Sequence, residues 1–145
     1  MTWAPHVTVA TIIERDKRFL MVYEESDGKL VYNQPAGHLD PEETLHEAAI
    51  RETLEETGWT IKLTSVVGVN LYTAPSNGIT YFRTTFIGEA VSHDANYTLD
   101  TGIIEAVWLT YEELLERKEQ LRSPMTLQIV EEYRAGRCFP LEVVG

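Results

Sequence analysis

The sequence has a single cysteine, no long apolar run and few basic residues, and each of these scarcities excludes a class of protein. Cys138 has no second cysteine with which to form an internal disulfide, which favours a reducing compartment. No apolar run is long enough to span a bilayer. The first residues have neither the basic region nor the apolar core of a signal peptide. We therefore expect a cytoplasmic protein that does not act on a membrane.

Basic residues are outnumbered by acidic ones. The chain has 12 Lys+Arg against 23 Asp+Glu, which gives a formal net charge of −11. A long nucleic acid requires a basic surface, so we do not expect such a partner. The same charge repels a small phosphate ester unless bound cations reverse the sign of the field locally. The composition alone fits equally well a charge that only keeps the protein soluble.

The chain does contain enough apolar residues for a globular core. Hydrophobic residues make up 43% of its 145 residues, which fits one domain over residues 1–145. The sequence shows no internal repeat, low-complexity tract or long linker. We expect a monomer, since nothing in the sequence indicates an obligate partner.

The pattern of apolar residues predicts strands arranged around one well-defined helix. The expected strands span residues 6–14, 18–24, 29–34, 59–72 with an interruption at Gly68, 79–90 and 103–109. The expected helices span residues 41–57, 111–118 and 125–135. This order favours an α+β sandwich rather than a doubly wound sheet.

The first helix has clear signals at both ends. Asp40 is placed to be its N-cap, Pro41 occupies the first helical position, and Glu43 completes a capping-box pattern. Gly58 is the expected terminator. Within this helix the small residues Ala48 and Ala49 are expected to leave room for a ligand.

Three carboxylates on this helix share one face. Glu52, Glu55 and Glu56 fall within an arc of about 100° because a helix turns by about 100° per residue. Like charges this close destabilise a helix unless they are neutralised, and Mg²⁺ favours carboxylate oxygens, water and phosphate as ligands. Arg51 is four residues from both Glu47 and Glu55, so it can pair with either one. For the helix alone, a solvated charged face is the competing interpretation.

A longer pattern around this helix resembles a known family motif. The chain contains Gly37-x5-Glu43-x7-Arg51-Glu52-Thr53-Leu54-Glu55-Glu56-Thr57-Gly58-Trp59. This resembles the Nudix box, G-x5-E-x7-R-E-U-x-E-E-x-G-U, in which U is bulky and apolar. Thr53 departs from the motif because an aliphatic residue is usual there, although threonine keeps a β-branched shape.

The resemblance implies a fold, a cofactor and a set of roles. The fold would be a Nudix-type α/β/α sandwich with a mixed β-sheet, in which the box forms a loop–helix–loop motif. The cofactor would be Mg²⁺, with Mn²⁺ as a substitute. The metal ligands would be Gly37 through its carbonyl, Glu52, Glu55 and Glu56.

The catalytic residues implied by the resemblance are Arg51, Glu52, Glu55 and one carboxylate outside the box. Glu43 and Arg51 would orient the metal ligands. The general base would be Glu52 or the outside carboxylate. Glu105 is the candidate for that outside carboxylate because it begins a Glu105-x-x-Trp108 segment found in many Nudix enzymes; a surface glutamate is the alternative.

Short segments along the chain are similar to one bacterial branch of the family, the NudJ-type phosphatases. These segments are residues 5–10, 33–39, 121–124 and 139–142. The similarity implies release of orthophosphate from nucleoside tri- and diphosphates and from hydroxymethylpyrimidine diphosphate. A pyrophosphohydrolase that cleaves oxidised nucleoside triphosphates or ADP-ribose is the alternative within the family. A non-catalytic domain that binds a metal or nucleotide is the alternative of another class.

Aromatic and basic side chains are the candidates for contact with this small diphosphate substrate. Aromatic rings can stack on a base, and arginine forms bidentate hydrogen bonds with phosphate. The candidates are Tyr32, Asn33, His38, Tyr72, Arg83 and Arg122. For each of them a packing or surface role is the competing interpretation.

Overall fold

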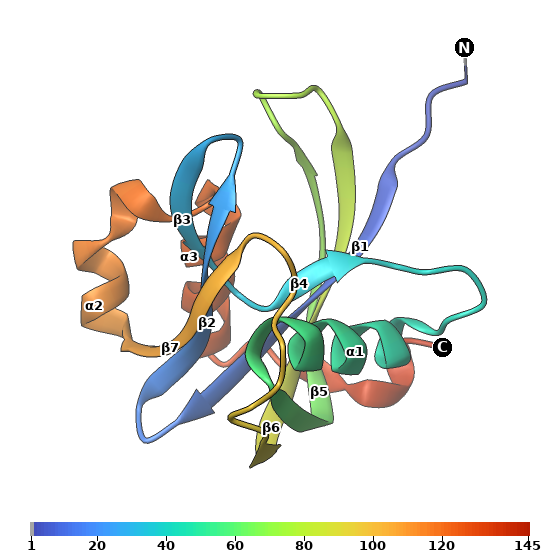
Figure 1. Ribbon diagram of the computed structural model, residues 1–145. Helices are drawn as coiled ribbons and strands as arrows, with labels where there is room; N and C mark the ends of the chain where they lie inside the picture. The colour runs from blue at the N-terminus through green and yellow to red at the C-terminus, as the bar shows by residue number, and fades with distance from the viewer. Residues whose placement is uncertain (1) are drawn as a thin grey trace.

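In the computed structural model, which describes residues 2–145, eight strands and three α-helices form a mixed-sheet fold (Figure 1). The strands are β1 (His6–Arg15), β2 (Arg18–Ser26), β3 (Lys29–Asn33), β4 (Ala36–His38), β5 (Trp59–Thr73), β6 (Thr80–His93), β7 (Ile103–Thr110) and β8 (Phe139–Pro140). The α-helices are α1 (Leu45–Thr57), α2 (Tyr111–Glu116) and α3 (Pro124–Arg134), and the 3-10 turns are η1 (Lys118–Gln120) and η2 (Leu141–Val143). Among the helices of this described part, none is long and apolar enough to cross a bilayer.

The sheet combines parallel and antiparallel pairs. Its strand order is β3-β2-β1-β6-β5-β8, with β4 paired to β1 and β7 paired to β2. Strands β1 and β6 run parallel, and the other pairs are antiparallel. The predicted α+β sandwich with a mixed sheet is confirmed. At Gly68 the chain does not leave the sheet; the register of β5 against β6 shifts between Val66 and Gly68 instead.

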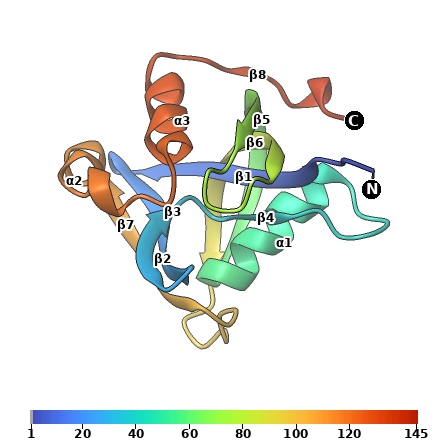
Figure 2. The ribbon, with the colours of Figure 1, turned by 90° about the horizontal axis from the view of Figure 1, so that it is seen from above.

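Helices α1 and α3 lie on opposite sides of the central strands (Figure 2). One core cluster joins Ala48 and Ala49 of α1 to Ile13 of β1 and Val66 of β5. The other core cluster joins α3 to the neighbouring residues of those same strands, Ile12 of β1 and Val67 of β5. Successive side chains of a strand point to opposite faces, so these adjacent apolar residues serve two cores. Because Ala48 and Ala49 are buried in the first core, the expectation that they leave room for a ligand is wrong.

Helix α1 begins four residues later than its sequence signals predict. Its N-cap is Thr44, whose side chain accepts a hydrogen bond from the Glu47 backbone N–H while the Glu47 carboxylate accepts one from the Thr44 N–H. Glu42 has a φ of 64°, which is incompatible with a right-handed helix. The carboxylate of Glu43 does accept a hydrogen bond from the Asp40 N–H, so that local contact forms outside the helix. The predicted N-cap at Asp40 is therefore wrong.

Replacement of the observed cap should cost more stability than replacement of the expected one. We predict that Thr44→Ala lowers the free energy of unfolding by about 1 kcal/mol, because a helix N–H loses its partner. Asp40→Ala should change it by less than about 0.5 kcal/mol, because Asp40 is exposed and its contact with Arg51 is long. Urea unfolding of the two variants measures both values, and the reverse order of effects would contradict the observed helix start.

Candidate functional site

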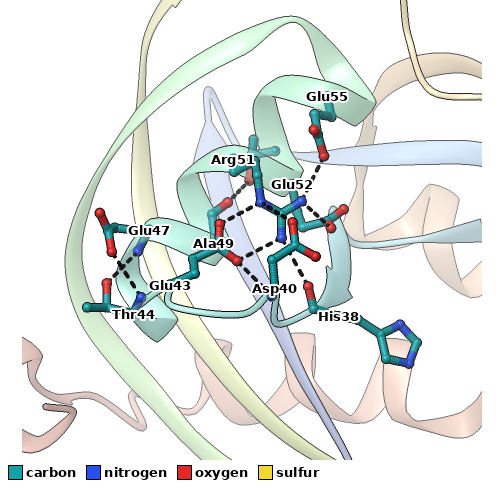
Figure 3. Close-up of polar contacts among 10 residues, drawn as sticks. His38, Asp40, Glu43, Thr44, Glu47, Ala49, Arg51, Glu52 and Glu55 are labelled. Atoms are coloured by element: carbon teal, nitrogen blue, oxygen red, sulfur yellow. Dashed lines mark hydrogen bonds and ion pairs between the residues drawn. The ribbon is translucent and has the colours of Figure 1, made fainter.

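Arg51 joins the carboxylates of the box to one another (Figure 3). Its guanidinium donates hydrogen bonds to Glu43 at 2.6 and 2.9 Å, to Glu52 at 2.7 Å and to Glu55 at 2.8 Å. A further bond of 3.0 Å reaches the carbonyl oxygen of His38 in the preceding loop. The bond from Arg51 holds the pKa of the Glu43 carboxyl below its usual value, and these partners raise the pKa of Arg51 itself. Arg51 is thus a fixed positive charge at the centre of the loop–helix junction.

Of the two ion-pair partners that the spacing allows for Arg51, Glu47 and Glu55, only Glu55 pairs with it. The pair with Glu55 is present at 2.8 Å. The carboxylate of Glu47 instead caps the helix through Thr44. Glu43, eight residues away, takes its place because the loop folds back along the first turns of α1.

Glu52 and Glu55 meet a third carboxylate, that of Asp100. One oxygen from each of the three lies within 4.8 Å of the others. Asp100 comes from the loop between β6 and β7, which lies against the C-terminal end of α1. The Asp100 N–H donates to the Glu55 carbonyl, and the Asp94 N–H donates to the Gly58 carbonyl. The sequence offers no spacing signal for Asp100, since it lies in an irregular loop far along the chain from the box.

Glu56 is the most deeply buried of the box carboxylates. Its side chain accepts a hydrogen bond of 2.9 Å from the Ala36 N–H. Burial raises the pKa of Glu56 to about 9, and the nearby charges of Glu24, Glu52 and Asp100 act in the same direction. Burial also raises the pKa of Glu52. A bound divalent cation would remove the unfavourable energy of these crowded charges.

Gly37 leaves the space that the Glu52 carboxylate occupies. A Cβ atom added at position 37 would lie 2.2 Å from Cδ and 2.3 Å from Oε2 of Glu52. The backbone of β4 therefore approaches the carboxylate as closely as only glycine allows. The carboxylates of Glu52, Glu55 and Glu56 are oxygen ligands of the kind that Mg²⁺ and Mn²⁺ favour. The residues that the box resemblance implies as ligands thus fit a divalent metal.

A cavity of about 610 Å³ opens beside these groups. Gly37, Glu52 and Glu56 are among the residues that line it. Of the six predicted substrate contacts, five line the same cavity: Asn33, His38, Tyr72, Arg83 and Arg122. The structure therefore brings candidate metal ligands and candidate substrate contacts together from distant parts of the chain. Tyr81 lies opposite Tyr72 in the β5–β6 hairpin and also lines the cavity.

Tyr32 is the predicted substrate contact that lies elsewhere. Its ring is 4.6 Å from that of Tyr23, and the guanidinium carbon of Arg117 is 5.7 Å from its centroid. The ring packs against the core cluster beneath α3. Tyr32 and Asn33 are neighbours in β3, and strand alternation turns the Tyr32 side chain away from the cavity and the Asn33 side chain toward it.

Glu105 does not join the other carboxylates. It is exposed on β7 and lies directly opposite Tyr23 in the β2–β7 pair. Cross-strand partners share a face of the sheet, so Glu105 lies on the face of Tyr23 and Tyr32. It belongs neither to the cavity lining nor to the Glu52–Glu55–Asp100 group.

Comparison with known proteins identifies the family. The model of the NUDIX domain matches residues 4–129. The chain is 37% identical to the phosphatase NudJ of Escherichia coli K12 over 141 residues, which are 97% of this chain and 91% of that protein. The chain therefore belongs to the Nudix family and is a Nudix hydrolase. Hydrolysis of a diphosphate linkage in a small molecule is the reaction that this membership assigns to the site.

Solved structures agree with this assignment. A Nudix hydrolase from Nitrosomonas europaea superposes with a TM-score of 0.96 at 42% identity, covering 98% of this chain and 97% of that one. An ADP-ribose pyrophosphatase from Streptococcus suis superposes with a TM-score of 0.68 at 13% identity, covering 92% of this chain and 93% of that one. The second likeness shows the fold alone.

The buried carboxylate should make the metal-free protein less stable as the pH rises. The pKa of Glu56 is about 9 in the folded protein and 4.5 in the ordinary state, so the folded protein holds an extra proton between these values. The stability that this proton contributes is complete below the lower value and is lost as the pH rises through the upper one. We predict a falling free energy of unfolding between about pH 6 and 9 in EDTA, with a smaller fall in Glu56→Gln.

Urea unfolding at each pH measures this slope. The matched control is Glu89→Gln, which removes an exposed carboxylate from β6 and should keep the wild-type slope. Equal slopes in wild type and Glu56→Gln would show that Glu56 does not take up the proton.

Proposed function

We propose that this Nudix hydrolase uses Mg²⁺ to release orthophosphate from nucleoside tri- and diphosphates and from hydroxymethylpyrimidine diphosphate, with Mn²⁺ as a substitute cation. The observation that carries the proposal is the meeting of buried carboxylates and two arginines around one cavity. The 37% identity to the phosphatase NudJ of E. coli K12 supports the choice of a phosphatase reaction. The cavity, at about 610 Å³, is within the range of about 300–1,000 Å³ found for small-molecule sites.

The residues proposed to hold the cation are the Gly37 carbonyl, Glu52, Glu55 and Glu56, joined by Asp100. A bound cation neutralises charge on phosphate oxygens and lowers the pKa of its water, which makes attack on phosphorus possible at neutral pH. Arg51 keeps Glu52 and Glu55 in place through its hydrogen bonds.

Proton transfer is assigned to Glu52. Its carboxylate lines the same cavity as Glu56 and the proposed substrate contacts, so it is placed to take a proton from an attacking water.

The organic part of the substrate is proposed to lie under the β5–β6 hairpin. Tyr72 and Tyr81 form a cross-strand pair there and offer aromatic surfaces for a heterocyclic base. Tyr81 is held by a hydrogen bond from the Asn77 side chain at 3.1 Å and by an edge contact with the His38 ring. Asn33 and His38, which line the same cavity, complete the proposed contacts.

Product analysis tests the proposed reaction. With Mg²⁺ present we expect orthophosphate from GTP, GDP and hydroxymethylpyrimidine diphosphate, and we expect EDTA to abolish it. Glu56→Gln should fold and lower turnover by about 100-fold or more, because a ligand charge is lost. Pyrophosphate from GTP or AMP from ADP-ribose would reject the phosphatase reaction and favour a pyrophosphohydrolase. Absence of any metal-dependent product would reject the proposed substrates, and normal turnover in Glu56→Gln would reject the metal assignment.

A matched pair of variants tests which carboxylate outside the box contributes. Asp100→Asn should weaken the apparent affinity for Mg²⁺ by about 10-fold or more, because Asp100 adjoins Glu52 and Glu55. Glu105→Gln should stay within about twofold of wild type at every pH, because Glu105 faces away from them. Turnover measured against Mg²⁺ concentration and pH for both variants distinguishes the two carboxylates. A pH-dependent loss of turnover in Glu105→Gln would restore Glu105 to the mechanism.

A further inference from the structure

Arg83 is a buried guanidinium without an acidic partner. It projects from β6 into the floor of the cavity, and only 9% of the residue is exposed. Its Nη2 donates a hydrogen bond of 3.0 Å to the neutral side chain of Gln34. Within residues 2–145, no ion pair links Arg83 to a carboxylate. Burial of a charge is strongly unfavourable unless an opposite charge compensates it, so this position calls for an anion.

The hydrogen bonds around Arg83 hold it rigidly without neutralising it. Gln34 is itself buried, and its amide donates to the carbonyl oxygen of Thr126 at 2.7 Å. The Thr126 hydroxyl donates to the Asn33 side chain at 3.1 Å. The chain of bonds fixes the guanidinium against the start of α3, and each of its members is neutral.

A second arginine lines the same side of the cavity. Arg122 lies just before α3, is exposed, and forms an ion pair of 3.2 Å with the buried carboxylate of Glu24. The positive charge of Arg122 adds to burial in lowering the pKa of Arg83 to about 10, so the two cations repel each other. Glu24 compensates one positive charge, and the other remains uncompensated. The adjacent cavity residues Ser123 and Met125 lie at the positive end of the α3 dipole.

We propose that Arg83 and Arg122, beside the first turn of α3, form an anion subsite that binds a phosphate group without a metal ion. The inference rests on the proposed function, since it assigns part of the same cavity. The phosphate is either the terminal group of the substrate or free orthophosphate, which share the chemistry that arginine recognises through paired N–H donors.

The subsite lies in the same cavity as Glu52 and Glu56, so carboxylates and arginines act on one bound molecule. A diphosphate presents two phosphate groups: one for the cation held by the carboxylates and one for the arginines. The diphosphate, rather than the organic group, is then the main unit of recognition. Substrates with different bases should therefore bind with similar affinity.

Phosphate binding in EDTA tests the subsite apart from catalysis. We expect orthophosphate to raise the thermal midpoint of the wild-type protein and to give a binding signal in calorimetry. Arg83→Gln should be more stable than wild type without phosphate, because a buried charge is gone, and should bind orthophosphate at least about tenfold more weakly. The matched control is Arg18→Gln, which removes an exposed arginine of β2 and should keep the wild-type response.

Phosphate binding by the wild type and its variants decides whether the subsite exists and which phosphate it holds. Absence of phosphate binding by wild type, or equal binding by Arg83→Gln, would overturn the subsite even if Mg²⁺-dependent turnover is normal. If Arg83→Gln does not fold, Arg122→Gln provides the same comparison at an exposed position. Competition with GDP identifies the source: displacement of orthophosphate assigns the subsite to the terminal phosphate of the substrate, and simultaneous binding assigns it to the product.

Discussion

The hydrogen bonds of Arg51 are the interaction on which the arrangement of the site depends. Glu43, Glu52 and Glu55 would repel one another at this spacing, and one guanidinium bonds to all three. The same group bonds to the His38 carbonyl, so the loop that carries Gly37 is tied to the helix that carries the carboxylates. Arginine keeps its charge at every physiological pH. The loop–helix–loop is therefore held in shape by hydrogen bonds within the chain itself.

Carboxylates and arginines line one cavity of a protein that is strongly acidic as a whole. The chain has a net charge of −11, and burial raises the pKa of the box carboxylates Glu52 and Glu56, with neighbouring carboxylates adding to the shift. In the same cavity the buried Arg83 has only a neutral hydrogen-bond partner among residues 2–145. A phosphate compound together with a divalent cation would compensate both groups of charges at once. The unfavourable burial of these charges is offset by the sheet and by α1 and α3, which bury apolar side chains in the two cores.

The parts of the fold that were predictable are those with local or periodic signals. Runs of β-branched and apolar residues locate β1 and β2 to within two residues, and the box identifies α1. The start of α1 was misplaced because Asp40, Pro41 and Glu43 imitate a helix N-terminus, while Arg51 draws Glu43 into the loop. The place of Asp100 beside Glu52 and Glu55 depends on contacts between distant segments, as does the absence of an acidic partner for Arg83 among the described residues. Spacing along the chain does not reveal such contacts. Tyr32 and Asn33 both lie next to the box, but their side chains lie on opposite faces of β3. Nearness to the motif in the sequence does not say which face turns toward the cavity.

Gly37 links two positions of the chain that are fifteen residues apart. The requirement is one of volume, since any Cβ at position 37 would enter the space of the Glu52 carboxylate. An alanine at 37 would displace the Glu52 carboxylate from this place, whereas a shorter residue 52, for instance aspartate, would leave room for the methyl group. Either change alone disturbs the contact between the loop and the carboxylate. The two positions are therefore expected to drift as a pair, and a lineage that has lost the glycine should carry a shortened acid or none at residue 52.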